Sequence, residues 1–151
     1  MLGNRAASQD HKVAGLSTKL KEKQEKLEQI ITQLAEEAAD GKPIVVEGKK
    51  DAQALEELGV KGRILTVKTG GKSFLEAAAE IEHLTAEEVI ILLDFDRRGK
   101  QGIRRLLMNL ERARIKVNMQ FWSMLCGLVG RDIQCVEGLP AYLDTLRQKA
   151  L

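Results

Sequence analysis

The sequence predicts an α/β fold with about four parallel strands, helices on both faces of the sheet, and one helix before it. Short apolar runs of strand length alternate with helical segments along most of the chain. The connections between them are short and contain turn-forming residues. Such alternation is typical of right-handed crossovers and therefore of a parallel sheet. A chain of 151 residues suits a single core.

The N-terminal 41 residues are expected to form a tail and an amphipathic helix. Residues 1–15 lack periodicity, whereas 17–39 contain few β-branched residues, no proline, and a stop at Asp40-Gly41. Three leucines recur every seven residues: Leu20, Leu27 and Leu34. Because a coiled coil needs three or four heptads, a helix packed along the sheet is favoured. A helix that binds a protein partner or a second copy is the alternative.

Four strands and their helices follow in order. Strands are expected at 43–47, 63–67, 88–94 and 116–121. Helices are expected at 50–58, 73–82, 99–113 and from about Pro140 to the C-terminus. Residues 122–129 could add a short helix. We therefore expect one domain over 42–122 and a helical extension over 123–151 packed on the same core.

Composition narrows the class of protein. Hydrophobic residues make up 44% of the chain and charged residues 30%, as in a soluble globular protein. No apolar run approaches the roughly 20 residues of a membrane span, and the N-terminus lacks the apolar region of a signal peptide. Cys126 and Cys135 have no second cysteine pair or nearby histidine, which argues against a zinc site. A reducing, cytoplasmic setting is the simplest expectation.

Two of the predicted strands end in carboxylates. Pro43-Ile44-Val45-Val46 runs into Glu47, and the apolar run 89–93 runs into Asp94 and Asp96. In open α/β sheets the C-terminal ends of the strands are where ligands bind. If these two strands are neighbours, the three acids converge. A hard divalent cation such as Mg²⁺ would neutralise them and share its other positions with water and phosphate.

The charge changes sign at this point in the sequence. Residues 76–96 carry seven acidic and no lysine or arginine side chains. Residues 97–116 carry eight basic residues and Glu111 as the sole acid. Such a junction could hold a metal beside the phosphates that it bridges.

The segments IVVEGKKDAQAL and VIILLDFDRRGKQGIRRL resemble the two motifs of the Toprim family. That family includes topoisomerases, bacterial-type primases, nucleases and small single-domain proteins, among them the ribonucleases that mature 5S ribosomal RNA. The resemblance covers residues 42–122 and implies a Toprim-like Rossmannoid fold. It also implies a site for Mg²⁺, or Mn²⁺, held by Asp94, Asp96 and Glu47, with Glu47 as general acid/base. Asp96 could in addition cap the following helix.

Basic residues gather around the same motifs. Arg98, Arg105 and Arg112 are spaced by seven, on the helix side opposite the apolar residues. Lys68 extends the expected basic rim. The predicted nucleic-acid- and phosphate-binding residues are Gly48, Lys49, Lys50, Lys72, Arg97, Arg98, Lys100 and Arg105. Since aromatic residues make up only 3% of the chain, stacking on single strands is disfavoured, which favours structured or ribosomal RNA; DNA is the alternative.

Three other activities fit the residues poorly. Gly71-Lys72-Ser73 follows a strand, but a P-loop needs a glycine at the position of Thr66. A phosphoaspartate phosphatase would need a hydroxyl residue where Arg98 stands. A topoisomerase would need a nucleophilic tyrosine, and the sole tyrosine, Tyr142, falls in the terminal helix.

The preferred hypothesis is therefore a Mg²⁺-dependent Toprim protein that cleaves RNA phosphodiester bonds. Many Toprim proteins have a glutamate directly after the glycine of the second motif, where this chain has Lys100. That difference supports a second hypothesis, a non-catalytic RNA- or ribosome-binding adaptor. Primase-like nucleotidyl transfer is a third, which the lack of a template-handling module disfavours.

Overall fold

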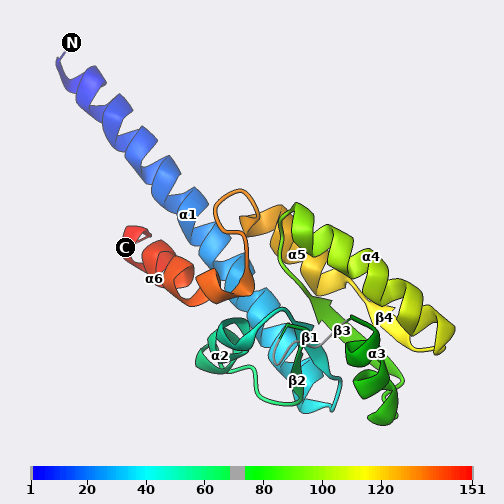
Figure 1. Ribbon diagram of the computed structural model, residues 1–151. Helices are drawn as coiled ribbons and strands as arrows, with labels where there is room; N and C mark the ends of the chain where they lie inside the picture. The colour runs from blue at the N-terminus through cyan, green and yellow to red at the C-terminus, as the bar shows by residue number, and fades with distance from the viewer. Residues whose placement is uncertain (1, 69–73, 151) are drawn as a thin grey trace.

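The chain folds into a four-stranded parallel sheet flanked by helices, in a computed structural model that describes residues 2–68 and 74–150 (Figure 1). The strands are β1 (Ile44–Val46), β2 (Ile64–Thr66), β3 (Glu88–Leu92) and β4 (Lys116–Asn118). The helices are α1 (Leu2–Ala39), α2 (Lys49–Glu57), α3 (Phe74–His83), α4 (Arg97–Arg112), α5 (Gln120–Val129) and α6 (Leu139–Lys149), with a short 3₁₀ helix, η2, at Val136–Gly138. The predicted α/β class is confirmed.

The strands lie in the order β2-β1-β3-β4, and each pair of neighbours is parallel. In the central pair, Val46 of β1 is opposite Leu92 of β3. The two strands that carry acids at their C-terminal ends are therefore adjacent and run the same way. The spatial assumption on which the predicted site depends is confirmed.

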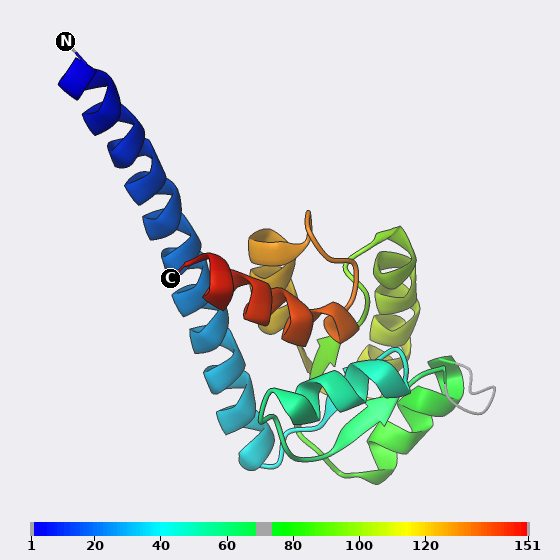
Figure 2. The same ribbon diagram turned by 90° about the vertical axis from the view of Figure 1, so that its left-hand side faces the viewer.

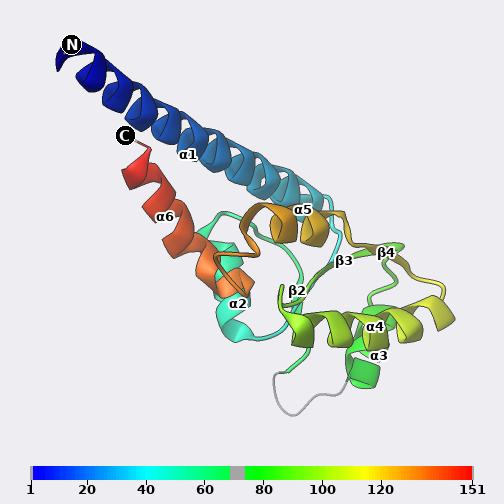
Figure 3. The same cartoon turned by 90° about the horizontal axis from the view of Figure 1, so that it is seen from above.

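Alternating strand residues build two separate parts of the core. Ile44, Val46, Ile90 and Leu92 face one cluster, which includes residues of α1, α2, α5 and α6. Val45, Val89, Ile91 and Leu93 face the other, formed with α3 and α4. This alternation follows from the two-residue period of a strand. Figure 3 shows the result, with α1 and α5 on one side of the sheet and α3 and α4 on the other.

Helix α1 starts earlier than predicted. It begins at Leu2, so the loose tail expected over 1–15 is wrong. Alanines and the absence of proline in this stretch let the helix extend at little cost once its C-terminal half is packed. Leu27 and Leu34 are fully buried against the sheet, while the N-terminal part extends beyond the rest of the chain (Figure 2). A partner or dimer role for this helix stays a prediction.

Within the described ranges, no helix combines the length and the apolar character that crossing a bilayer requires.

Strands β1 and β2 are one residue shorter at each end than predicted, and β3 and β4 end two and three residues early. Strand β3 ends at Leu92 rather than at residue 94, because its pairing with β1 stops there. Strand β4 ends at Asn118, whose side-chain Oδ1 accepts a hydrogen bond of 2.9 Å from the backbone N–H of Gln120. This local bond favours a turn over further strand and starts α5 at Gln120.

Helix α4 offers a matched test of the core. Leu106 is fully buried against the sheet, whereas Met108 on the same helix is 57% exposed. Leu106→Ala is expected to lower the free energy of unfolding by about 2–5 kcal/mol, since it removes buried methyl groups and leaves a cavity. Met108→Ala should change it by less than about 0.5 kcal/mol. Urea unfolding of both variants measures the difference; equal effects would contradict the assignment of this face to the core.

Candidate metal and nucleic-acid site

The acidic residues lie at the C-terminal edge of the sheet. Glu47 directly follows β1, and Asp94 and Asp96 lie in the connection between β3 and α4. Because β1 and β3 are neighbours, these carboxylates approach one edge from adjacent strands. The negative charges of Glu47 and Asp96 both act on Asp94, as expected for side chains that share a site.

Glu47 is a buried acid with an unsatisfied oxygen. The residue is only 5% exposed, and its backbone carbonyl accepts a 2.9 Å hydrogen bond from Lys68 N–H. The Lys68 ammonium lies 2.5 Å from Glu47 Oε2 as an ion pair. Its approach lacks hydrogen-bond geometry, so Oε2 has no hydrogen-bond partner among the described residues. The oxygen already lies against one cationic group, and a buried carboxylate in such a position is suited to a metal cation.

Asp94 has a strongly perturbed pKa. The pKa of Asp94 is raised to about 6, mainly by burial and then by the negative charges of Glu47, Asp51 and Asp96. Lys68 acts in the opposite direction. At neutral pH the ionised carboxylate therefore sits among other negative charges. A divalent cation would relieve this repulsion.

The pKa of Asp94 predicts a specific pH dependence of stability. Between about pH 4 and pH 6, the folded chain holds a proton on Asp94 that the unfolded chain has released. Raising the pH through this window therefore lowers the free energy of unfolding. Asp94→Asn removes the charge, so without divalent cations it should raise the Tm at pH 7.5 more than at pH 4.5. Thermal unfolding at both pH values measures this, and an equal change at both would contradict it.

Backbone contacts anchor the connection that carries both aspartates. The indole Nε1 of Trp122 donates to the carbonyl oxygen of Leu93 at 3.0 Å and lies 3.4 Å from that of Asp94. Phe95 is 5% exposed, and its N–H donates to the carbonyl oxygen of Gln134 at 2.7 Å. Asp96 directly precedes α4, and its carbonyl oxygen accepts from Lys100 N–H at 3.2 Å. The loop is thus held between α5 and the segment near residue 134.

The described residues contain a further group of possible ligands beside these carboxylates. Asp51, Cys135 and Glu137 each place a ligand atom within 4.8 Å of the others, whereas Glu47, Asp94 and Asp96 do not form such a group. The Cys135 thiol has a raised pKa, mainly through burial and then through the charges of Asp51 and Asp94. A protonated thiol is a poor ligand for a hard cation. Glu47, Asp94 and Asp96 offer oxygen atoms alone, the donor type that a hard cation prefers.

Sequence reasoning missed Asp51 and the segment around residue 135. Asp51 is 7% exposed and lies on the buried side of α2 with Ala54 and Leu55. An acid at a core-facing position of an amphipathic helix is a signal that could have found it. Glu137 has no such signal, because its backbone reaches Asp51 across 86 residues of sequence.

The structure describes the side chains of some, but not all, of the predicted phosphate-binding residues. Lys49 and Lys50 are exposed in the first turn of α2, and Lys100 and Arg105 are exposed on α4. Apart from its chain neighbours, no described residue lies within 4 Å of where a side-chain carbon at Gly48 would be. Lys72 lies outside the described residues, as do the side chains of Arg97 and Arg98. The nucleic-acid role of all these residues stays a prediction.

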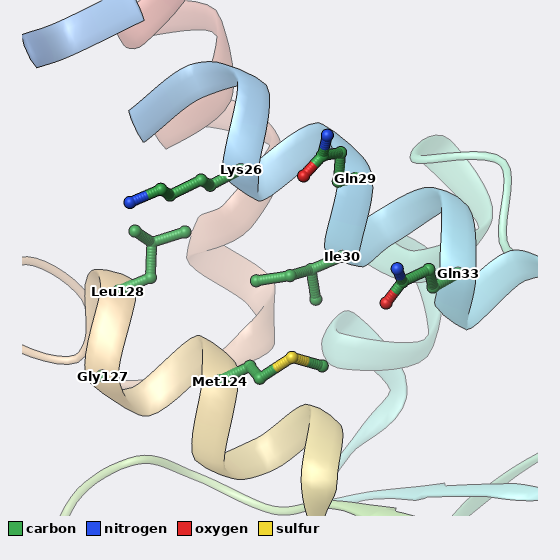
Figure 4. A pocket seen from close by; sticks show the side chains of 7 residues that line it. All are labelled: Lys26, Gln29, Ile30, Gln33, Met124, Gly127 and Leu128. Carbon is green, nitrogen blue, oxygen red and sulfur yellow. The ribbon is translucent and has the colours of Figure 1, made fainter. Parts of the chain in front are cut away.

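A pocket of about 380 Å³ lies away from this edge, between α1 and α5. Figure 4 shows Ile30 of α1 and Met124 of α5 extending toward the space between the two helices. Its other lining residues are Lys26, Gln29, Gln33, Gly127 and Leu128. The pocket contains no carboxylate, and we assign it no part in the chemistry at the strand ends.

Several archaeal proteins are similar to this chain over most of its length. A UPF0292 protein of Methanocaldococcus jannaschii is 36% identical over 80% of this chain and 91% of its own. A UPF0292 protein of Thermococcus sibiricus is 34% identical over 86% of this chain and 96% of its own. A solved structure of an Aquifex aeolicus protein superposes with a TM-score of 0.60 at 24% identity, covering 72% of this chain and 94% of that one, which shows the shared fold.

The segment that holds the acidic edge matches the model of a known protein family. The family model of the Toprim domain matches residues 41–119, which include β1 to β4, Glu47, Asp94 and Asp96. Toprim domains typically bind a divalent metal and imply a metal-dependent function related to nucleic acids. The match covers more than half of the sequence, and we conclude that this chain belongs to the Toprim family.

Proposed function

We propose that this protein cleaves phosphodiester bonds of structured or ribosomal RNA in a Mg²⁺-dependent reaction. The observation that carries the proposal is the buried Glu47, whose Oε2 has no hydrogen-bond partner among the described residues, at the same sheet edge as Asp94. Exposed lysines border that edge from α2 and α4. A site for a neutral substrate would need neither the buried acid nor the bordering lysines, whereas a site for a phosphodiester backbone uses both.

In this proposal Glu47 has two tasks, as general acid/base and as a metal ligand, and the other side chains have one each. Glu47 takes the proton from the attacking water and can return it to the leaving oxygen. Asp94 and Asp96, with Glu47, hold Mg²⁺, or Mn²⁺ in its place. When bound, the cation supplies neutralisation of the charge that develops on the phosphate. Lys49, Lys50 and Lys100 position the phosphates of the backbone.

A direct test incubates the purified protein with ribosomal RNA and with a folded RNA hairpin. We expect discrete cleavage products with Mg²⁺ or Mn²⁺ and none with EDTA. A DNA hairpin of the same sequence is the matched substrate, and faster cleavage of DNA would move the proposal to that polymer. Intact RNA and intact DNA under all these conditions would refute cleavage.

A second candidate function is an adaptor that binds RNA or the ribosome without catalysis. It is favoured by Lys100, a cation near the motif where many Toprim proteins have an acid, and by the spread of the three carboxylates. The adaptor binds RNA in EDTA as tightly as in Mg²⁺ and leaves it intact. Gel-shift binding with and without EDTA separates it from the nuclease. Primase-like transfer has no such observation in its favour.

A further inference from the structure

The segment that follows α5 contacts the loop that carries Asp94 and Asp96, and it contacts helix α2, which follows Glu47. It lies beyond the residues that the Toprim family model matches, which end at 119. At its start, the carbonyl oxygen of Gln134 accepts the N–H of Phe95 at 2.7 Å. At its end, the N–H of Glu137 donates to Asp51 Oδ1 at 2.9 Å. Residues 134–137 therefore contact the connection after β3 and the first turn of α2, which follows β1.

Asp51 connects this segment to the first acidic motif. Its other oxygen, Oδ2, accepts the N–H of Gly48 at 3.1 Å, and Gly48 directly follows Glu47. Asp51 lies in the first turn of α2, which packs against η2, and it is only 7% exposed. Both carboxylate oxygens are thus engaged by backbone amides that lie far apart in the sequence. A hydrogen bond to a charged acceptor is stronger than one between neutral groups.

Phe95 connects the segment to the second acidic motif. It stands between Asp94 and Asp96, and its ring is buried in the core cluster that also contains Val136. The ring and the N–H together fix the peptide units next to both aspartates. The other described contacts of this backbone are the indole of Trp122 on Leu93 and Asp94, and the N–H of Lys100 on Asp96 at the start of α4.

We propose that residues 134–137 form a clamp that holds the Glu47 loop and the Asp94–Asp96 loop at a fixed separation. Asp51 is the positioning residue of this clamp, since it joins Gly48 to Glu137. The consequence for Mg²⁺ rests on the proposed function: a loosened clamp lets the carboxylates move apart and weakens the cation site. The clamp itself is a property of the chain with or without metal.

The rival explanation is that Asp51, Cys135 and Glu137 bind a cation directly, because their ligand atoms lie within 4.8 Å of one another. The two explanations differ in the group that Glu137 contributes. The clamp uses its backbone N–H, whereas its side chain is half exposed and lies 4.0 Å from the ammonium of Lys50. Removing the Glu137 carboxylate or the Cys135 thiol therefore leaves the clamp intact.

The experiment compares four single variants with the wild type. Asp51→Ala removes both acceptors, and Asp51→Asn retains one carbonyl acceptor in nearly the same volume. Glu137→Gln and Cys135→Ser keep every backbone bond of the clamp. For each folded variant, amide hydrogen exchange is measured by NMR without metal, and Mg²⁺ affinity is measured by calorimetry.

We expect exchange at Gly48, Phe95 and Glu137 to accelerate at least tenfold in Asp51→Ala, and by less in Asp51→Asn, while Ile90 in the core is unchanged. The Mg²⁺ dissociation constant should rise at least tenfold in Asp51→Ala and less than twofold in Glu137→Gln and Cys135→Ser. Unchanged exchange at Phe95 in both Asp51 variants overturns the clamp. Equal loss of Mg²⁺ affinity in Glu137→Gln establishes direct ligation and also overturns it.

The exchange measurement separates this proposal from the proposed function. If the wild type binds no Mg²⁺, the proposed metal-dependent chemistry fails, and the exchange rates at Gly48, Phe95 and Glu137 still decide whether the clamp exists. If Asp51→Ala does not fold, Asp51→Asn supplies the same comparison with one acceptor retained.

Discussion

Glu47→Gln is expected to reduce Mg²⁺-dependent RNA cleavage by about 100-fold or more, the contribution of a well-placed general acid/base. Glutamine keeps the volume and one carbonyl oxygen but cannot take a proton from water at neutral pH. The change removes the negative partner of the Glu47–Lys68 ion pair, but the Lys68 side chain is more than half exposed and can be solvated by water. The fold should therefore survive, and the loss should appear in the rate of cleavage.

The matched control is Glu57→Gln, which removes an exposed carboxylate from the C-terminal end of α2. Its cleavage rate should stay within about twofold of the wild type, since surface charges far from the chemistry have small effects. Cleavage is followed on a 5′-labelled RNA hairpin under single-turnover conditions. A Glu47→Gln rate above half that of the wild type would remove Glu47 from the chemistry.

The double variant Lys100→Gln, Arg105→Gln is expected to weaken RNA binding about tenfold or more at low salt. Both side chains are exposed on α4, which starts directly after Asp96. Each phosphate contact that is lost removes about one unit from the slope of log affinity against log salt. The slope should therefore fall by about two. Binding is measured by fluorescence anisotropy in EDTA across a KCl series, so that cleavage does not interfere.

Lys61→Gln is the control for this variant. Lys61 is exposed in the connection before β2, at the opposite, N-terminal end of the strands. It should leave both the affinity and the salt slope nearly unchanged. If Lys61→Gln lowers the slope as much as a single change on α4, RNA binds without preference for the acidic edge, and the predicted basic rim is wrong.

The sequence was most informative where one physical rule dominates. Apolar runs that end abruptly at Glu47 and Asp94 predict buried parallel strands, and β1 and β3 are indeed adjacent. Local sequence rules were less useful for α1. Residues 1–15 show no apolar repeat at the helix period, but the helix begins at Leu2. Helix extension depends on the packed residues that follow it, which a local pattern does not reveal.

The candidate site was predicted only in part for a similar reason. Glu47, Asp94 and Asp96 lie at strand ends, a position that sequence periodicity reports directly. Beside the indole of Trp122, the contacts near these loops come from Gln134 and Glu137, through backbone groups that every residue has. A backbone N–H or carbonyl group leaves no trace in residue type. The connection between Asp51 and Glu137 could therefore be found only in three dimensions.

The central claim is that Glu47, Asp94 and Asp96 bind a divalent cation at the shared end of β1 and β3. Isothermal calorimetry of the metal-free protein with Mg²⁺ tests it most directly, with Asp94→Asn and Asp144→Asn as the variant and its exposed control. We predict saturable Mg²⁺ binding in the wild type and in Asp144→Asn, and a loss of at least tenfold in affinity in Asp94→Asn. Absence of Mg²⁺ binding up to millimolar concentrations, or equal binding by all three proteins, would contradict it.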